Sequence, residues 1–257
     1  WDEFNAIATK MKAAGITPVA HGSIDWIDGT LFEIVVYGIS DELYKKTFVQ
    51  LDDAALRGPE MVRAFEQMRK MIEWTDPGIP GRQWDVAAPM MLKGEAGFHF
   101  MGDWAIGFFN ANNFVPGVDY LCGGAPMNSG KPGFILNSDS VIFFKQKDPD
   151  YIAGQALLAE TIMDPAFQKA FNIKKGSIPA RMDVDLAEFN PCQQLSMKDL
   201  QASIQADTLV RSMAHNMSVA QKYRGAMFEV ITEFVNDPRI TPKDAAAQLA
   251  DAVLAQM

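Results

Sequence analysis

Apolar residues recur every three or four positions along several stretches of this chain, as they do on one face of an α-helix. Residues 59–74 show the pattern most clearly, with an apolar face made of Met61, Phe65, Met68 and Ile72. Residues 2–14 repeat it and are followed by Gly15, a residue type that favours a helix C-terminus. The spacing therefore predicts two helices here. It predicts further helices near 86–93, 149–162, 164–172, 196–206, 213–235 and 242–256.

Shorter apolar runs, rich in β-branched and aromatic residues, indicate strands between these helices. They lie at 16–20, at 96–101, at the start of 119–127 and on both sides of the polar centre of 134–145. Residues 30–39, TLFEIVVYGI, fit either a strand or a buried helix, and the polar stretch 21–29 before them is expected to be a loop. Strands that alternate with helices along the chain predict an α/β fold.

The stretch FHFMGDWAIGFF, residues 98–109, places a tryptophan at a predicted strand-to-helix turn. The apolar run ends at Gly102, and Asp103 then opens a helix with Trp104 as its second residue. The negative charge of Asp103 suits a helix N-terminus, where the helix dipole is positive. Trp104 is either an ordinary packed core residue or a side chain that faces whatever lies above the sheet.

The composition is that of an ordinary globular protein, but the charge is one-sided. The net charge of −9, from 32 acidic and 23 basic residues, argues against nucleic-acid binding, which requires a basic face. No apolar run reaches the length of a membrane span. The chain begins with Trp1 rather than Met, so we expect a processed or truncated chain.

The common signatures of metal, nucleotide and nucleophile chemistry do not occur in the sequence. His21, His99 and His215 are far apart and fit no metal-binding spacing. Neither G-x-S-x-G nor G-x-G-x-x-G is present, and GGAPMNSGKP departs from a phosphate loop at Ala125 and Pro132. We therefore expect no metal and no cofactor. The 32 acidic residues leave a glycosidase-like pair of carboxylates open.

The two cysteines, Cys122 and Cys192, are separated by 70 residues. This spacing fits no zinc or redox motif. Two interpretations stay open at this point: the cysteines form a disulfide, or both are buried thiols.

What remains is a set of aromatic and hydrogen-bonding residues: Trp26, Trp104, Asn137, Asp139, Lys175 and His215. A pyranose has an apolar face that stacks on an indole and a ring of hydroxyls that amide, carboxylate, lysine and histidine side chains can satisfy. Each residue also has a purely structural interpretation. The tryptophans suit a core, the asparagine a turn, the lysine a solvated surface and the histidine a helix-capping region.

Several segments resemble, in order, the segments of one protein family. They are WDEFNAIATKMKAAGITPVA, WTDPGIPGRQW, GEAGFHFMGDWA, DYLC, FILNSDS, FNIKKGSIPAR and SMAH, of which GDWA and KGSIPAR are the more specific. The set resembles the ABC-transporter extracellular solute-binding proteins of the sugar-binding class. It is most similar to the periplasmic glucose-binding branch.

The resemblance implies a set of ligand-binding residues. In that branch the tryptophan of GDW, the asparagine of N-x-D-S, the lysine of K-G-S-I-P and the histidine of M-A-H contact the sugar. The matching positions here are Trp104, Asn137, Lys175 and His215. Trp26, in GSIDWID, matches a loop beside the cleft. The resemblance also implies that Cys122 and Cys192 are paired in a disulfide.

The family implies a two-lobed α/β fold with a hinge, the type II periplasmic-binding-protein architecture. Relatives carry a lobe of roughly a hundred residues before WDEF that has no counterpart here. The resemblance therefore assigns 1–136 to most of the second lobe, 137–181 to the hinge crossing and a fragment of the first lobe, and 182–257 to a return to the second lobe.

The function implied is that of a periplasmic sugar-binding subunit of an ABC importer, not an enzyme. It is expected to be a monomer that binds a glucose-like monosaccharide and presents it to a membrane permease. Two alternatives stay open: a carbohydrate-active enzyme that uses a carboxylate pair, and a protein of the same scaffold that binds an oligosaccharide or a polyol.

Overall fold

The computed structural model describes residues 1–257, which fold into two compact units. Unit 1 consists of Trp1–Met101, Gly124–Asn137 and Asp199–Met257, and unit 2 consists of Gly102–Gly123 and Ser138–Lys198. No helix is long and apolar enough to cross a membrane.

The units do not follow the predicted segments everywhere. The resemblance implied breaks after residues 136 and 181, whereas 102–123 and 182–198 both cluster with unit 2. The assignment of the segments to the two lobes of the family stays a prediction.

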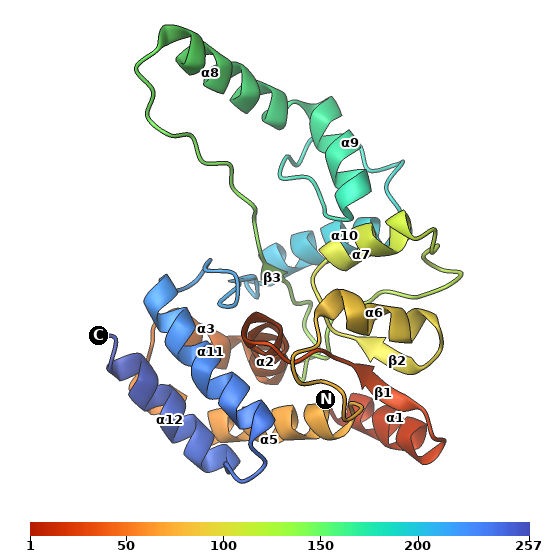
Figure 1. Cartoon of the computed structure of the whole chain (residues 1–257), viewed down its shortest axis with the longest axis vertical. Coiled ribbons are helices and arrows are strands. Elements are labelled where there is room, and N and C mark those ends of the chain that lie inside the picture. The colour runs from red at the N-terminus through yellow and green to blue at the C-terminus, as the bar shows by residue number, and fades with distance from the viewer. The chain divides into compact units, whose positions relative to one another are not determined.

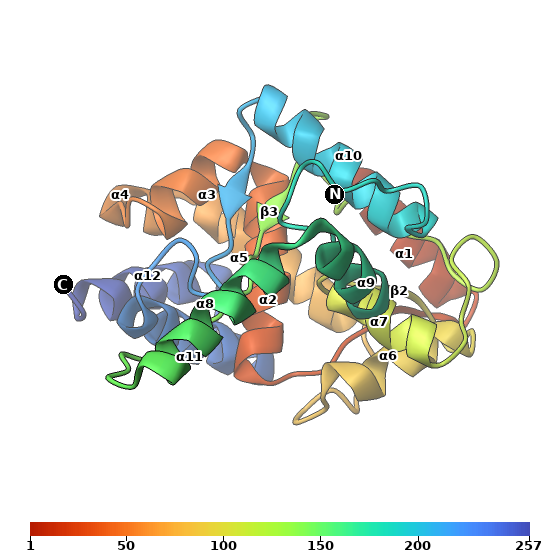
Figure 2. The same ribbon diagram turned by 90° about the horizontal axis from the view of Figure 1, so that it is seen from above.

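Unit 1 is a bundle of helices that flanks two short pairs of strands (Figures 1 and 2). Its helices are α1 (Asp2–Ala13), α2 (Asp25–Ile39), α3 (Asp41–Phe48), α4 (Asp53–Leu56), α5 (Pro59–Glu73), α6 (Trp84–Leu92), α11 (Gln221–Asn236) and α12 (Pro242–Leu254). Its strands are β1 (Thr17–Ala20), β2 (Ala96–His99), β3 (Ile135–Leu136) and β4 (Val210–Arg211).

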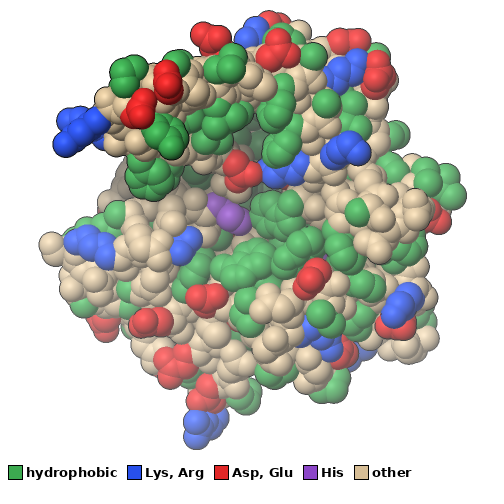
Figure 3. Space-filling view, turned by 45° about the horizontal axis from the view of Figure 1, so that its top comes forward, with side chains coloured by type: hydrophobic (Ala, Val, Ile, Leu, Met, Phe, Trp, Pro, Cys, Tyr) green, Lys and Arg blue, Asp and Glu red, His purple; other side chains and the backbone are tan.

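Unit 2 consists of α7 (Trp104–Ala111), α8 (Pro149–Met163), α9 (Pro165–Lys175) and the start of α10 (Pro191–Gln205), which ends in unit 1. No residue of α8 is buried. Hydrophobic side chains, green in Figure 3, are visible at the surface. In unit 2 the large exposed ones include Ile142, Phe144, Tyr151 and Leu157.

Helix α2 is the centre of the core of unit 1, where it packs against α3, α5 and α11. It contains the whole of the ambiguous segment 30–39, and it is buried on nearly all sides, which explains the absence of an amphipathic pattern. The ring centroids of Phe32 and Phe65 lie 4.4 Å apart between α2 and α5. The loop predicted over 21–29 was wrong from Asp25 onward, because α2 begins there with two acidic residues in its first turn.

Both pairs of strands in unit 1 are parallel. Thr17 faces Ala96 in the β1–β2 pair, and Ile135 faces Val210 in the β3–β4 pair. Parallel pairs joined through helices are the connection that an α/β fold uses.

Two predicted strands did not form as expected. Residues 119–127 contain no strand, and within 134–145 only Ile135–Leu136 pairs with a neighbour. Val141 and Ile142 are exposed, and no other strand pairs with their segment. An apolar, β-branched sequence becomes a strand only where a second strand offers hydrogen bonds.

Three predicted helix bounds also required correction. The helix predicted at 164–172 continues to Lys175, and the helix predicted near 196–206 begins earlier, at Pro191. The helix predicted over 213–235 begins at Gln221, because the preceding loop bonds elsewhere in unit 1.

Candidate functional site

Two glycines bring the backbones of α7 and the end of α9 into direct contact in unit 2. A Cβ atom on Gly107 would lie 2.2 Å from the carbonyl oxygen of Lys175, and one on Gly176 would lie 2.4 Å from the amide nitrogen of Gly107. Gly176 ends α9 at φ 92°, a conformation that glycine adopts readily. Trp104 lies one turn before Gly107, and Lys175 is the last residue of α9. The contact therefore fixes the backbone positions of both predicted sugar-binding residues.

Charged groups surround the ends of these two helices. The ammonium group of Lys175 forms an ion pair with the carboxylate of Asp139. Asp103 precedes α7 but makes no side-chain cap bond. Burial raises the pKa of Asp103 to about 6, which Lys175 opposes and Asp139 reinforces. The cluster thus combines the cationic donor Lys175, its ion-paired partner Asp139 and a buried carboxyl group, Asp103, whose pKa is raised.

Buried amide side chains hold the loop that follows α9. The Nε2 of Gln193 donates to the carbonyl oxygens of Asn172, at 2.7 Å, and of Ser177, at 2.8 Å. The hydroxyl of Ser177 donates to Asn172 Oδ1, and the amide of Ala180 donates to Gln168 Oε1. These bonds satisfy polar groups inside the unit, so the conformation of the KGSIPAR segment is tightly specified.

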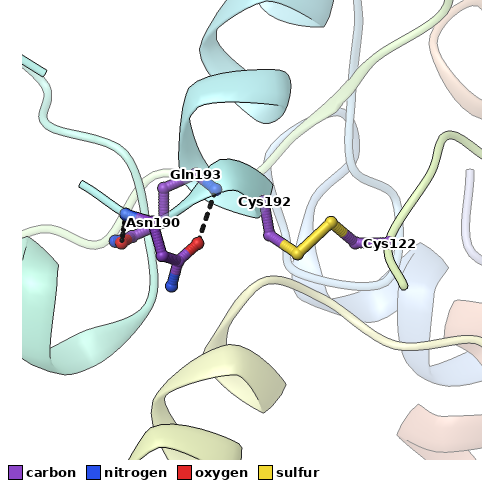
Figure 4. Close-up of a disulfide and its surroundings, with 4 residues drawn as sticks. All are labelled: Cys122, Asn190, Cys192 and Gln193. Carbon is purple, nitrogen blue, oxygen red and sulfur yellow. Dashed lines mark hydrogen bonds between the residues drawn. A yellow bond between two sulfur atoms is a disulfide. The ribbon is translucent and has the colours of Figure 1, made fainter. Parts of the chain in front are cut away.

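The two cysteines are joined by a disulfide in unit 2, with their Cα atoms 5.7 Å apart (Figure 4). Cys192 is the second residue of α10. The start of this helix is fixed by a reciprocal pair of bonds: Gln193 N donates to Asn190 Oδ1, and Asn190 N donates to Gln193 Oε1. The helix cap therefore presents Cys192 to the exposed segment that holds Cys122.

In unit 1, the predicted site residue Asn137 and the nearby Ser212 follow adjacent parallel strands. Asn137 comes directly after β3, and Ser212 comes directly after β4. The amide of Ser212 donates to the carbonyl oxygen of Leu136 at 2.9 Å, which extends the pairing by one residue. Open α/β sheets bind ligands at the carboxyl ends of their strands. Asn137 and the loop that carries His215 share such an edge.

A buried glutamate holds that loop. The carboxylate of Glu33, on α2, accepts hydrogen bonds from the hydroxyls of Ser212, at 2.7 Å, and Tyr44, at 2.8 Å. It also accepts from the amides of Met213, at 2.8 Å, and Ala214, at 3.2 Å. Burial raises the pKa of Glu33, while these hydrogen bonds act to lower it.

His215 contacts this network directly, and Trp26 lies on the helix that carries Glu33. His215 Nδ1 lies 2.8 Å from the hydroxyl oxygen of Ser212 and 3.8 Å from Glu33 Oε1, and its side chain is 21% exposed. Trp26 is half-buried and lies seven residues before Glu33 on α2, hence on the same face two turns away.

The structure thus divides the predicted site residues between the units: Trp26, Asn137 and His215 in unit 1, Trp104 and Lys175 in unit 2. No group of three or more histidine, cysteine, aspartate or glutamate side chains could hold a metal ion. The donors, acceptors and indoles suit a polar organic ligand with many hydroxyls.

Glu33 was not among the predicted site residues, although its segment offered a signal. It is the only charged residue in TLFEIVVYGI. A carboxylate is rarely fully buried without partners, so a lone acidic residue in a buried run indicates a specific polar network.

Residues 1–207 match the model of the bacterial extracellular solute-binding protein family. The chain belongs to this family. It is 39% identical over 253 residues to the "Probable sugar-binding periplasmic protein" of Rhizobium meliloti (strain 1021), covering 98% of this chain and 60% of that protein. A protein with the same description from Brucella suis biovar 1 (strain 1330) is also 39% identical, with 98% and 59% covered. The chain therefore spans about 60% of the length of these curated relatives.

Solved structures confirm the predicted α/β fold of the solute-binding proteins. The bacterial solute receptor AcbH, described as having an exclusive preference for β-D-galactopyranose, matches with a TM-score of 0.68 at 18% identity. That match covers 100% of this chain and 64% of the receptor. A chitin oligosaccharide binding protein matches with a TM-score of 0.72 at 16% identity, with 100% and 65% covered.

Proposed function

We propose that this protein binds a sugar in the periplasm and delivers it to the membrane permease of an ABC importer, and that it is not an enzyme. The observation that carries the proposal is the 39% identity, over 98% of the chain, to proteins described as probable sugar-binding periplasmic proteins. We further propose that the ligand is a monosaccharide such as glucose.

In this proposal the five predicted residues divide the recognition of one pyranose. The indole of Trp104 stacks on the apolar face of the ring, and Trp26 lies beside the cleft. Lys175 donates hydrogen bonds to sugar oxygens, because an ammonium group has no acceptor. Asn137 and His215 bind further hydroxyls. Several convergent polar groups around an aromatic wall are typical of such sites.

Capture and release follow from the two-lobed architecture that the family uses. Closure of one lobe on the other buries the sugar and fixes its hydroxyls, and the lobes reopen at the permease. We propose that the protein does this as a monomer.

A panel of ligands tests the proposal on the full-length gene product. Thermal shifts are recorded with D-glucose, D-galactose, maltose, a chitin oligosaccharide and xylitol. A ligand at 100 times its dissociation constant adds about 2.7 kcal/mol to the free energy of unfolding, so binding is easily seen. A shift with a monosaccharide supports the proposal. Shifts with only maltose or the chitin oligosaccharide would identify the ligand as an oligosaccharide. No shift with any sugar would overturn sugar binding.

The non-enzymatic role has its own test. The protein is incubated with 4-nitrophenyl glycosides, and release of nitrophenol is followed by absorbance. Binding without product supports a transport role. Steady turnover would instead identify a carbohydrate-active enzyme.

Variants test the assigned contacts. We expect Lys175→Ala and His215→Ala each to weaken sugar binding at least tenfold, about 1.4 kcal/mol, with little change in melting temperature. Lys174→Ala is the matched control, because Lys174 is an exposed lysine of the same helical turn. If the variants lose stability but keep their affinity for sugar, both residues have a structural role and do not contact the sugar.

A further inference from the structure

The donors around Glu33 fit an ionised carboxylate. Backbone amides can only donate, and those of Met213 and Ala214 both point at Oε2. The hydroxyl of Tyr44 lies 2.8 Å from Oε2 and 2.9 Å from the carbonyl oxygen of Arg211, so these two acceptors share its one hydrogen. The hydroxyl of Ser212 contacts Oε1 at 2.7 Å. A carboxylate accepts at both oxygens, whereas a carboxylic acid would bring a further hydrogen into this set.

The hydroxyl of Ser212 has a single hydrogen, and its neighbours decide where that hydrogen lies. It donates to Glu33 Oε1 and accepts from the backbone amide of His215 at 3.1 Å. Its remaining contact, 2.8 Å from His215 Nδ1, then has one consistent assignment. The ring nitrogen must donate, so Nδ1 carries the hydrogen.

We propose that Glu33 is a positioning residue that acts through Ser212 to hold His215 as the tautomer whose Nε2 accepts a hydrogen bond from a sugar hydroxyl. A neutral imidazole with hydrogen on Nδ1 has a lone pair on Nε2. The proposal rests on the proposed function, in which His215 contacts the sugar. It adds the sense of that contact: the sugar hydroxyl is the donor and His215 Nε2 is the acceptor.

The opposite state of Glu33 would reverse every bond of this chain. A protonated carboxyl would donate to Ser212, Ser212 would donate to His215 Nδ1, and Nε2 would carry the hydrogen. Glu33→Gln imposes that reversal with nearly the same shape. Its amide oxygen accepts from Met213 and Ala214, and its NH2 group then faces Ser212 and donates to it.

Nuclear magnetic resonance tests the relay without any sugar. The ¹⁵N shifts and long-range couplings of the three histidine rings are recorded at pH 8.5, about two units above the ordinary histidine pKa of about 6.5. We expect His215 with hydrogen on Nδ1 in the wild type and on Nε2 in Glu33→Gln. Hydrogen on Nε2 in the wild type overturns the proposal, even where the variant fails to fold.

A second buried carboxylate provides the matched control. Asp28 lies on the same helix and is hydrogen-bonded to His21 at 2.9 Å. Asp28→Asn is expected to change the signals of His21 and to leave the tautomer of His215 unchanged. A reversed His215 tautomer in this control would show that the effect is not specific to Glu33 and would overturn the relay.

Affinity measurements on the full-length gene product separate this proposal from the proposed function. In titrations with D-glucose, Glu33→Gln is expected to bind at least tenfold more weakly than the wild type, because the sugar hydroxyl must reorient and its hydrogen loses the acceptor at Nε2. Unchanged affinity, beside a reversed tautomer, overturns the positioning role and leaves sugar binding intact. Failure of the wild type to bind any sugar of the panel overturns the proposed function instead, and the tautomer result still decides the relay.

Discussion

Replacing Gly107 by alanine should force α7 and α9 apart at the point where they position Trp104 and Lys175. The added Cβ atom would lie 2.2 Å from the carbonyl oxygen of Lys175 and 2.7 Å from its carbonyl carbon. Both are backbone atoms at the end of a helix, so no side chain can rotate away to relieve the overlap. The end of α9 must shift.

The size of the effect follows from two opposing contributions. Overpacking of this kind costs about 1–3 kcal/mol, and a rigid backbone partner places Gly107 toward the upper end. Alanine in place of glycine inside a helix gains about 1 kcal/mol. The net expectation is a loss of about 1–2 kcal/mol in the free energy of unfolding. The displacement of Lys175 should also weaken sugar binding by the full-length gene product.

Gly154→Ala is the matched control for this experiment. Gly154 lies inside α8 of the same unit, and no atom lies within 4 Å of the position that its Cβ would take. Urea denaturation followed by circular dichroism should therefore show a gain for Gly154→Ala and a loss for Gly107→Ala. Equal stabilisation by both substitutions would refute the contact as the structure has it.

Three further changes have expected outcomes. Trp104→Ala should weaken sugar binding at least tenfold, about 1.4 kcal/mol, in fluorescence titrations, and unchanged affinity would remove it as a wall of the site. Because the pKa of Asp103 is raised to about 6, its folded form binds a proton more tightly than the unfolded chain. Its contribution to stability should be fully present below about pH 4 and lost as pH rises through about 6, and thermal melts of Asp103→Asn should lack this slope. Replacing both Cys122 and Cys192 by serine should lower the free energy of unfolding by about 4 kcal/mol, because the disulfide closes a loop of 70 residues. In the wild type, thiol counting on the denatured, unreduced protein should find no free thiol.

The fold was partly predictable, because some elements depend mainly on their own residues. Helix α5 forms where the apolar spacing predicted it, since one of its faces is solvated and the period of the pattern survives. Helix α2 could not be distinguished from a strand, because burial on nearly all sides removes that period. Residues 141–144 have the composition of a strand but no partner strand in this structure. Strand formation requires hydrogen bonds between two segments, so the sequence of one segment alone cannot predict it.

The candidate site was likewise only partly predictable from the sequence. The chemical types at Trp104, Lys175 and His215 were apparent from the sequence and from the resemblance. The contacts that position these residues could not be predicted. The glycine contact between α7 and α9 joins residues 69 positions apart, and the hydrogen bond from Ser212 to Glu33 joins residues 179 positions apart. No periodicity connects such distant positions.

By itself, the sequence determined the α/β class, the amphipathic helix α5 and the acidic net charge that argues against a nucleic-acid partner. These properties depend on composition and local spacing. Only the tertiary structure decided the burial of Glu33, the hydrogen-bond sense at Ser212 and the contact that fixes Lys175. Each of these depends on which atoms are brought together, because a hydrogen bond or a steric overlap exists only at a few ångströms.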